Sequence, residues 1–152
     1  MEESRNRLTP RVSEQAELLR ALAARCEREE PSREMDEAIG RAFGVEPGHV
    51  FTGGLDGDDV WLAYTSSLDA AVTLKPRHWY TEEVSFDIDG WHVTFTRGLG
   101  DRVKARSNNA PSEAQARCAA ALKARAAIAE QEQASTKRGE ANLNPTLSKA
   151  GA

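Results

Sequence analysis

Alternation of apolar and polar residues is clearest between Glu82 and Thr96, where the sequence reads EEVSFDIDGWHVTFT. The pair Asp89-Gly90 divides this stretch into two segments that each alternate with a period of two. Such a pattern is typical of a β-hairpin with a two-residue type I′ turn, in which both central residues need a positive φ. This register predicts that the apolar residues oppose one another on a single, core-facing side. The predicted pairs are Ile88 with Trp91, Phe86 with Val93, and Val84 with Phe95.

A third strand is predicted over residues 102–106, RVKAR, after a glycine-containing turn at residues 97–101. Val103 and Ala105 alternate with three basic residues, so the apolar pair is expected to face the core and the basic residues to face outward. Three strands with one apolar face need a covering layer to be stable. The sequence therefore predicts an antiparallel meander that packs against helices.

Helical periodicity predicts four helices around this meander. Their predicted ranges are residues 13–29, 32–43, 66–74 and 112–133. Hydroxyl residues stand where each first turn needs a cap, and Gln115 follows the last of them by three residues, as in a capping box. These caps are Ser13, Ser32, Thr65-Ser66 and Ser112. The third helix is expected to bury Leu68, Ala71 and Val72, and the last helix is rich in alanine, which favours close packing on a sheet.

Together these elements predict one α+β domain over residues 13–133, with an α/β/α sandwich-like arrangement. The second face of the sheet is either open to solvent or covered by the remaining helices. Residues 1–12 are expected to be disordered, and residues 134–152, where the composition turns polar, to form a flexible tail. Residues 45–59 are predicted to be a loop. Its GGLDGDD segment (53–59) lacks the ligand spacing of an EF-hand, so an acidic loop is expected rather than a calcium site.

Composition is that of an ordinary globular chain of 152 residues, with 39% apolar residues and a net charge of −4. No run of apolar residues is long enough for a membrane span, and the N-terminus lacks the apolar region of a signal peptide. A cytoplasmic protein without membrane association is therefore expected. Cys26 and Cys118 lie on apolar helical faces and outside any metal-binding pattern, so both are predicted to be buried free thiols. No cofactor or metal site is predicted.

Charge is distributed unevenly along the chain. Residues 1–59 carry a balance of −6, and residues 97–125 a balance of +5. A basic third strand could bind nucleic acid, and the acidic first part could imitate the charge of nucleic acid toward a basic protein. The candidate contact residues for a partner protein or nucleic acid are Arg97, Arg102, Lys104 and Arg106 of the basic region, together with Asp87 and His92 on the hairpin.

Four motifs in order along the chain resemble a known family. They are PSREMDEAIG, YTSSLDAAVTLKP, a strand that contains Trp79 and Tyr80, and APSEAQARCAAALKARAA. Together, over residues 14–129, they resemble small phage and prophage proteins of the phage ABA-sandwich-domain type. The resemblance implies a phage or prophage origin and helix/sheet/helix layering, and it implies no particular activity.

Catalytic chemistry has one candidate pair, Asp87 and His92, which the predicted register places opposite each other beside Ser85 and Thr94. A surface ion pair is the favoured interpretation, because a solvated sheet face lacks a cleft and an oxyanion hole. The leading hypothesis is therefore a non-enzymatic phage accessory protein that binds a host protein in the bacterial cytoplasm. Its candidate targets include antiviral defence systems, as for anti-CRISPR proteins. The alternative is a nucleic-acid-binding protein that uses the basic third strand.

Overall fold

The computed structural model describes residues 11–50, 58–98 and 103–150. The α+β class, the four helices and the three-stranded antiparallel sheet, in the order β3-β4-β5, are confirmed. In chain order the elements are α2 (Arg11–Arg28), α3 (Arg33–Ala42), β1 (Gly48–Val50), β2 (Asp58–Val60), α4 (Leu68–Val72), β3 (Trp79–Asp87), β4 (Gly90–Arg97), β5 (Val103–Arg106) and α5 (Glu113–Ala150).

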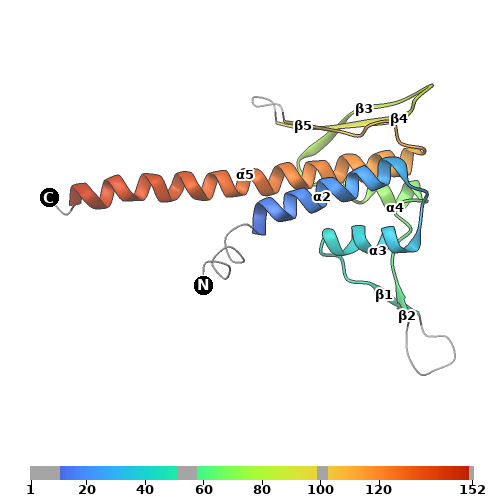
Figure 1. Ribbon diagram of the computed structural model, residues 1–152, viewed down its shortest axis with the longest axis horizontal. Coiled ribbons are helices and arrows are strands. Elements are labelled where there is room, and N and C mark those ends of the chain that lie inside the picture. The colour runs from blue at the N-terminus through green and yellow to red at the C-terminus, as the bar shows by residue number, and fades with distance from the viewer. Residues whose placement is uncertain (1–10, 51–57, 99–102, 151–152) are drawn as a thin grey trace.

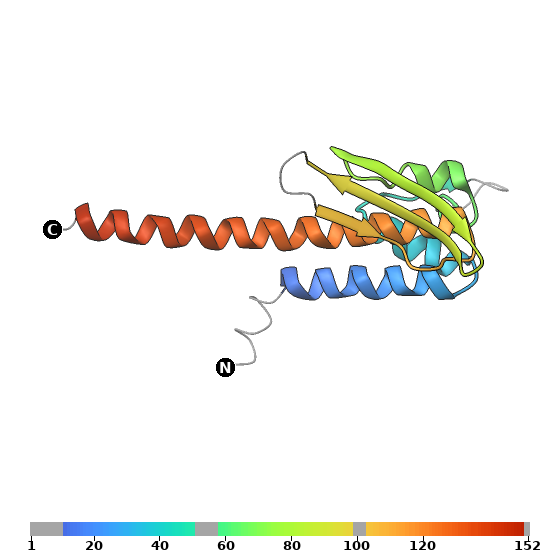
Figure 2. The same ribbon diagram turned by 90° about the horizontal axis from the view of Figure 1, so that it is seen from above.

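The helices lie on one side of the three-stranded sheet (Figure 1). Helix α5 runs directly beneath the strands, and α2 lies alongside it in the opposite direction, as both views show (Figures 1 and 2). Helix α3 and the small β1-β2 ladder lie farther from the sheet. Of the two arrangements that the sequence left open, the sheet therefore has the one with an open second face, at least among the described residues.

The core is centred on α5 and on strand β4. Val93 and Phe95 of β4 are buried, as is Leu122 of α5. The alanine-rich part of α5 buries its small side chains almost completely, so the helix can approach both the sheet and α2 closely. This confirms the predicted cover. The buried alanines are Ala114, Ala116, Ala119, Ala120, Ala121, Ala124 and Ala126.

The hairpin turns one residue earlier than predicted. Asp87 pairs with Gly90, Phe86 with Trp91, and Val84 with Val93, so the predicted pairs are wrong. The cause is the side chain of Asp87, which accepts a hydrogen bond from the backbone N–H of Asp89 at 2.8 Å and so forms an Asx turn. Gly90 has φ +132°, and a Cβ there would lie 2.7 Å from the carbonyl oxygen of Ala110.

A bulge near Glu82 interrupts the β3-β4 ladder between Thr81 and Glu83. One extra residue reverses the alternation of sides along a strand. Trp79 therefore shares a face with Val84 even though their numbers differ in parity. The two ends of β3 differ in burial. Trp79 at its start lies in the core, whereas the end next to the turn is exposed.

The apolar residues at the turn end of β3 are exposed, which corrects their prediction as core. Phe86 is 67% exposed and Ile88, at the tip of the turn, is 99% exposed. Val84 is also exposed. The covering helices do not reach this end of the hairpin, which extends past them in Figure 1.

Two further helix boundaries differ from the predictions. Helix α4 is capped by Ser67, whose hydroxyl accepts from the N–H of Ala70, rather than by Thr65 or Ser66. As a result Leu68 and Val72 point outward and are exposed. Helix α5 continues to Ala150, so the expected helix end near residue 133 is wrong.

The ends of the expected loop at 45–59 pair as the β1-β2 ladder, while residues 51–57, most of the acidic loop, lie outside the described part. Helix α2 begins at Arg11, inside the segment expected to be disordered, and residues 1–10 also lie outside the described part.

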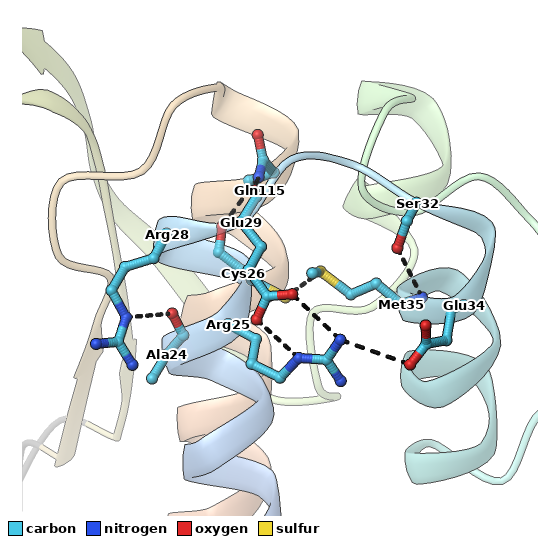
Figure 3. Close-up of polar contacts among 9 residues, drawn as sticks. All are labelled: Ala24, Arg25, Cys26, Arg28, Glu29, Ser32, Glu34, Met35 and Gln115. Atoms are coloured by element: carbon cyan, nitrogen blue, oxygen red, sulfur yellow. Dashed lines mark hydrogen bonds and ion pairs between the residues drawn. The ribbon is translucent and has the colours of Figure 1, made fainter.

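The end of α2 is fastened to α5 by Gln115 (Figure 3). Its Nε2 donates to the carbonyl oxygens of Cys26 at 3.1 Å and Glu29 at 2.5 Å, two groups that the end of a helix leaves without partners. Its backbone N–H donates to Ser112 at 3.1 Å, which confirms the predicted cap. The cap of α3 is also as predicted, since Ser32 accepts from the N–H of Met35 at 3.1 Å.

Candidate functional site

The predicted basic cluster does not form a single surface. Thr96 pairs with Lys104 and Arg97 pairs with Val103, so Arg97 projects from the opposite side of the sheet to Lys104 and Arg106. Lys104 and Arg106 are exposed, as predicted, on the open face of the sheet. Arg102 lies outside the described residues.

Several cations of the basic region already have acidic partners. Lys104 pairs with Glu82 at 3.1 Å. Lys123 lies 3.0 Å from the buried carboxylate of Glu27 and also donates to the carbonyl oxygen of Arg106 at 2.9 Å, which ties α5 to α2 and β5. Lys104 and Lys123 are therefore engaged within the fold, whereas Arg97 and Arg106 form no ion pair with a described residue.

Some acidic residues of the first part of the chain also have internal partners. Glu29 pairs with Arg25 and Glu37 with Arg41 along their helices, at 2.9 and 2.8 Å. Asp36 is buried.

Asp87 and His92 do meet, although Ser85 rather than Asp87 lies opposite His92. Oδ2 of Asp87 lies 3.0 Å from Nε2 of His92. The backbone N–H of Asp89, and then His92, hold the pKa of Asp87 below its usual range. Neither Ser85 nor Thr94 forms a hydrogen bond with His92. The pair therefore fastens the turn of the hairpin, and no nucleophile among the described residues is coupled to it.

Asp36 and Thr65 join the two motifs that begin PSREMD and YTSSLD. Oδ1 of Asp36 accepts from the backbone N–H of Thr65 at 2.9 Å and from its hydroxyl at 2.7 Å, and both residues are buried. The sequence assigned the hydroxyl of Thr65 to a helix cap and missed this contact. Its only signal was the similarity of the two motifs, in which residues 32–36 (SREMD) match residues 65–69 (TSSLD). Asp69, the matching aspartate of the second motif, is exposed.

The two cysteines are buried free thiols, as predicted. Burial raises the pKa of Cys26 to about 12, and it also raises the pKa of Cys118. Sγ of Cys118 donates to the carbonyl oxygen of Tyr64 at 3.2 Å. A thiol held in its protonated form is a poor nucleophile and a poor metal ligand.

Val84, Phe86 and Ile88 form an exposed apolar surface at the turn end of β3, which we call the hairpin surface. The ring of Phe86 lies 5.1 Å from that of Trp91, centroid to centroid, at 45°. This contact orients Phe86 without covering it. A second apolar region is a groove of about 520 Å³ between α2 and α3, where Leu18 is 70% exposed.

Comparisons with known proteins give no relative: no family model, no curated protein and no solved structure matches this chain. Among the described residues, no helix is long and apolar enough to cross a membrane. The same part of the chain contains no group of three or more His, Cys, Asp or Glu side chains placed to hold a metal ion. The functional argument therefore depends on the surfaces themselves.

Proposed function

We propose that this protein is a non-enzymatic binding protein that engages another protein through the hairpin surface. The observation that carries the proposal is the exposure of Phe86 and Ile88 at the end of a projecting hairpin. Aromatic and aliphatic side chains that protrude from a rigid element can fill a partner's pocket and dominate the binding energy. Contiguous exposed apolar residues are typical of interaction sites.

Strand β3 adds a second means of contact. It is nine residues long and forms one edge of the sheet, so its outer side pairs with no strand of the described chain. An edge strand of this length can accept an extended strand from a partner on either side of its bulge. Glu83 and Asp89 are exposed beside the hairpin surface and form no ion pair with a described residue. We therefore expect a partner with an apolar contact surface bordered by basic side chains.

The same contacts favour protein over nucleic acid as the partner. The acidic residues of the hairpin would repel phosphates. Lys104 already has an acidic partner, and Arg97 projects from the opposite face of the sheet to Lys104 and Arg106. The resemblance of the four motifs to phage proteins guides the first choice of partner. We expect a phage or prophage accessory protein that binds a protein of its bacterial host, and antiviral defence proteins are the first class to test.

The test compares the full chain with the double variant Phe86→Ser/Ile88→Ser and with Leu18→Ser as the control. All three side chains are largely exposed, so each variant should remain folded. Proteins captured from bacterial lysate by the unmodified chain are identified and purified, and their affinities for the three chains are then measured. We expect the double variant to bind at least about tenfold more weakly, a loss of about 1.4 kcal/mol, and the control to bind normally.

Equal affinity of the partner for the double variant would refute the hairpin as the binding site. A gel-shift assay at two salt concentrations tests the alternative. A shift at low salt that Arg106→Glu abolishes and Phe86→Ser leaves unchanged would favour nucleic acid instead.

A further inference from the structure

A pocket of about 530 Å³ lies where β3 begins, β4 ends and α5 passes beneath the sheet. Its walls include Arg77, His78 and Trp79 from the start of β3, Arg97 from the end of β4, and Ile128 from α5. Its volume is within the range of small-molecule sites in proteins. This pocket is at the opposite end of β3 from the hairpin surface.

The indole N–H of Trp79 has no hydrogen-bond partner within the described part of the chain. Trp79 is only 2% exposed, so water does not satisfy this donor freely. A buried donor without a partner costs the fold about 1–3 kcal/mol. Such a group next to a pocket is explained when a ligand supplies the missing acceptor.

Two guanidinium groups border the same pocket. Arg77 and Arg97 form neither an ion pair nor a side-chain hydrogen bond with any residue that the structure describes. Glu132 and Arg97 line an adjoining hollow of about 370 Å³, but they form no ion pair with each other. Arginine binds carboxylate and phosphate oxygens through two parallel N–H groups, so an oxyanion is the ligand that these side chains suit.

The backbone at His78 supports a built site. The N–H of Trp79 donates to the carbonyl oxygen of Pro76 at 3.2 Å, and His78, the third residue of this turn, has φ +69°. Glycine would adopt this conformation without strain, whereas a residue with a Cβ does so at a cost. Residues with a strained backbone cluster at binding sites. This turn places the imidazole of His78 and the guanidinium of Arg77 beside the pocket.

We propose that this pocket binds a small organic molecule through an oxyanion, either a phosphate monoester or a carboxylate. One acceptor oxygen reaches the buried Nε1 of Trp79 once the neighbouring side chains move aside, and the negative charge lies between Arg77 and Arg97. The apolar part of the ligand packs on Ile128. Arg77 and His78 are exposed, so their side chains can reorient around the ligand. This site is separate from the proposed protein-binding surface and does not rest on it.

The test uses the indole N–H signals in proton–nitrogen NMR spectra of the full chain. The chain has three tryptophans, and the signal absent from the variant Trp79→Phe identifies Trp79. The probes are phenyl phosphate, benzoate and the neutral benzyl alcohol, each added to about ten times a Kd of about 1 mM. We expect phenyl phosphate, benzoate or both to shift the Trp79 signal saturably, while benzyl alcohol leaves it in place. The two anions distinguish a phosphate site from a carboxylate site.

The variant Arg97→Gln should weaken this binding at least about tenfold, because a charge-assisted pair is lost. Arg106→Gln is the matched control, since it removes the same charge from the open face of the sheet. A Trp79 signal that no anion moves would overturn the proposal. So would equal shifts with benzyl alcohol, or equal effects of Arg97→Gln and Arg106→Gln.

Discussion

Replacement of Asp36 by alanine tests whether the paired motifs are structural. This carboxylate is 7% exposed and accepts two hydrogen bonds from Thr65, which is fully buried. Its removal leaves an N–H and an O–H buried without an acceptor. Each unsatisfied donor costs about 1–3 kcal/mol, so Asp36→Ala should lower the free energy of unfolding by about 2–6 kcal/mol. Domains of this size are stable by roughly 5–15 kcal/mol, so the loss is a large share of the total.

The measurement is urea unfolding followed by far-ultraviolet circular dichroism. Asp69→Ala is the matched control, because Asp69 has the corresponding place in the second motif but is exposed. It should change the free energy of unfolding by about 0.5 kcal/mol or less. Thr65→Val removes the hydroxyl but keeps the backbone N–H, and it should cost about 1 kcal/mol. In a double-mutant cycle, the coupling energy between Thr65→Val and Asp36→Ala should also be about 1 kcal/mol. The reasoning is refuted if Asp36→Ala is no more destabilising than Asp69→Ala.

Two further predictions concern packing and pH. Gly40→Ala should destabilise the chain by about 1–3 kcal/mol in thermal unfolding, although alanine favours helices, because a Cβ at Gly40 would lie 2.4 Å from the ring of Trp61. Gly48→Ala, whose Cβ would make only ordinary contacts, is the control, and a stabilised Gly40→Ala variant would contradict the geometry. The raised pKa of Cys26 means that the unfolded chain releases this proton first as pH rises. Its contribution to stability should therefore be intact below about pH 8.5 and should be lost as pH rises toward 12. Unfolding measured across this range should show a shallower decline in Cys26→Ala, and an unchanged slope would disprove the linkage.

The sequence predicted the elements of the fold better than it predicted their pairing. The alternation around Asp89-Gly90 is compatible with two registers, because moving the turn by one residue leaves the same side chains on the same face. Phe86 can oppose either Val93 or Trp91 without any change in the apolar pattern. The contact from Asp87 to the N–H of Asp89 decides between them, and a binary pattern does not contain that contact.

Burial and site geometry depend on where the helices end relative to the strands. The apolar pattern of β3 could not show that Trp79 is buried and Phe86 is exposed, since both side chains are large and aromatic. The length of the turn between β4 and β5 decides the register of the two strands, and this register makes Arg97 and Lys104 project from opposite faces of the sheet. The pocket beside Trp79 also escaped prediction, because its residues come from three separate segments and form no motif.

The length of β3 separates the two proposed sites. Nine steps separate Trp79 from Ile88. A strand advances about 3.3 Å per residue and the bulge shortens this path, so the two ends are at most about 30 Å apart. A small molecule at one end and a protein at the other would not touch, and neither would block the other's approach. The two proposed sites therefore lie at opposite ends of one strand, where each stays accessible while the other is occupied.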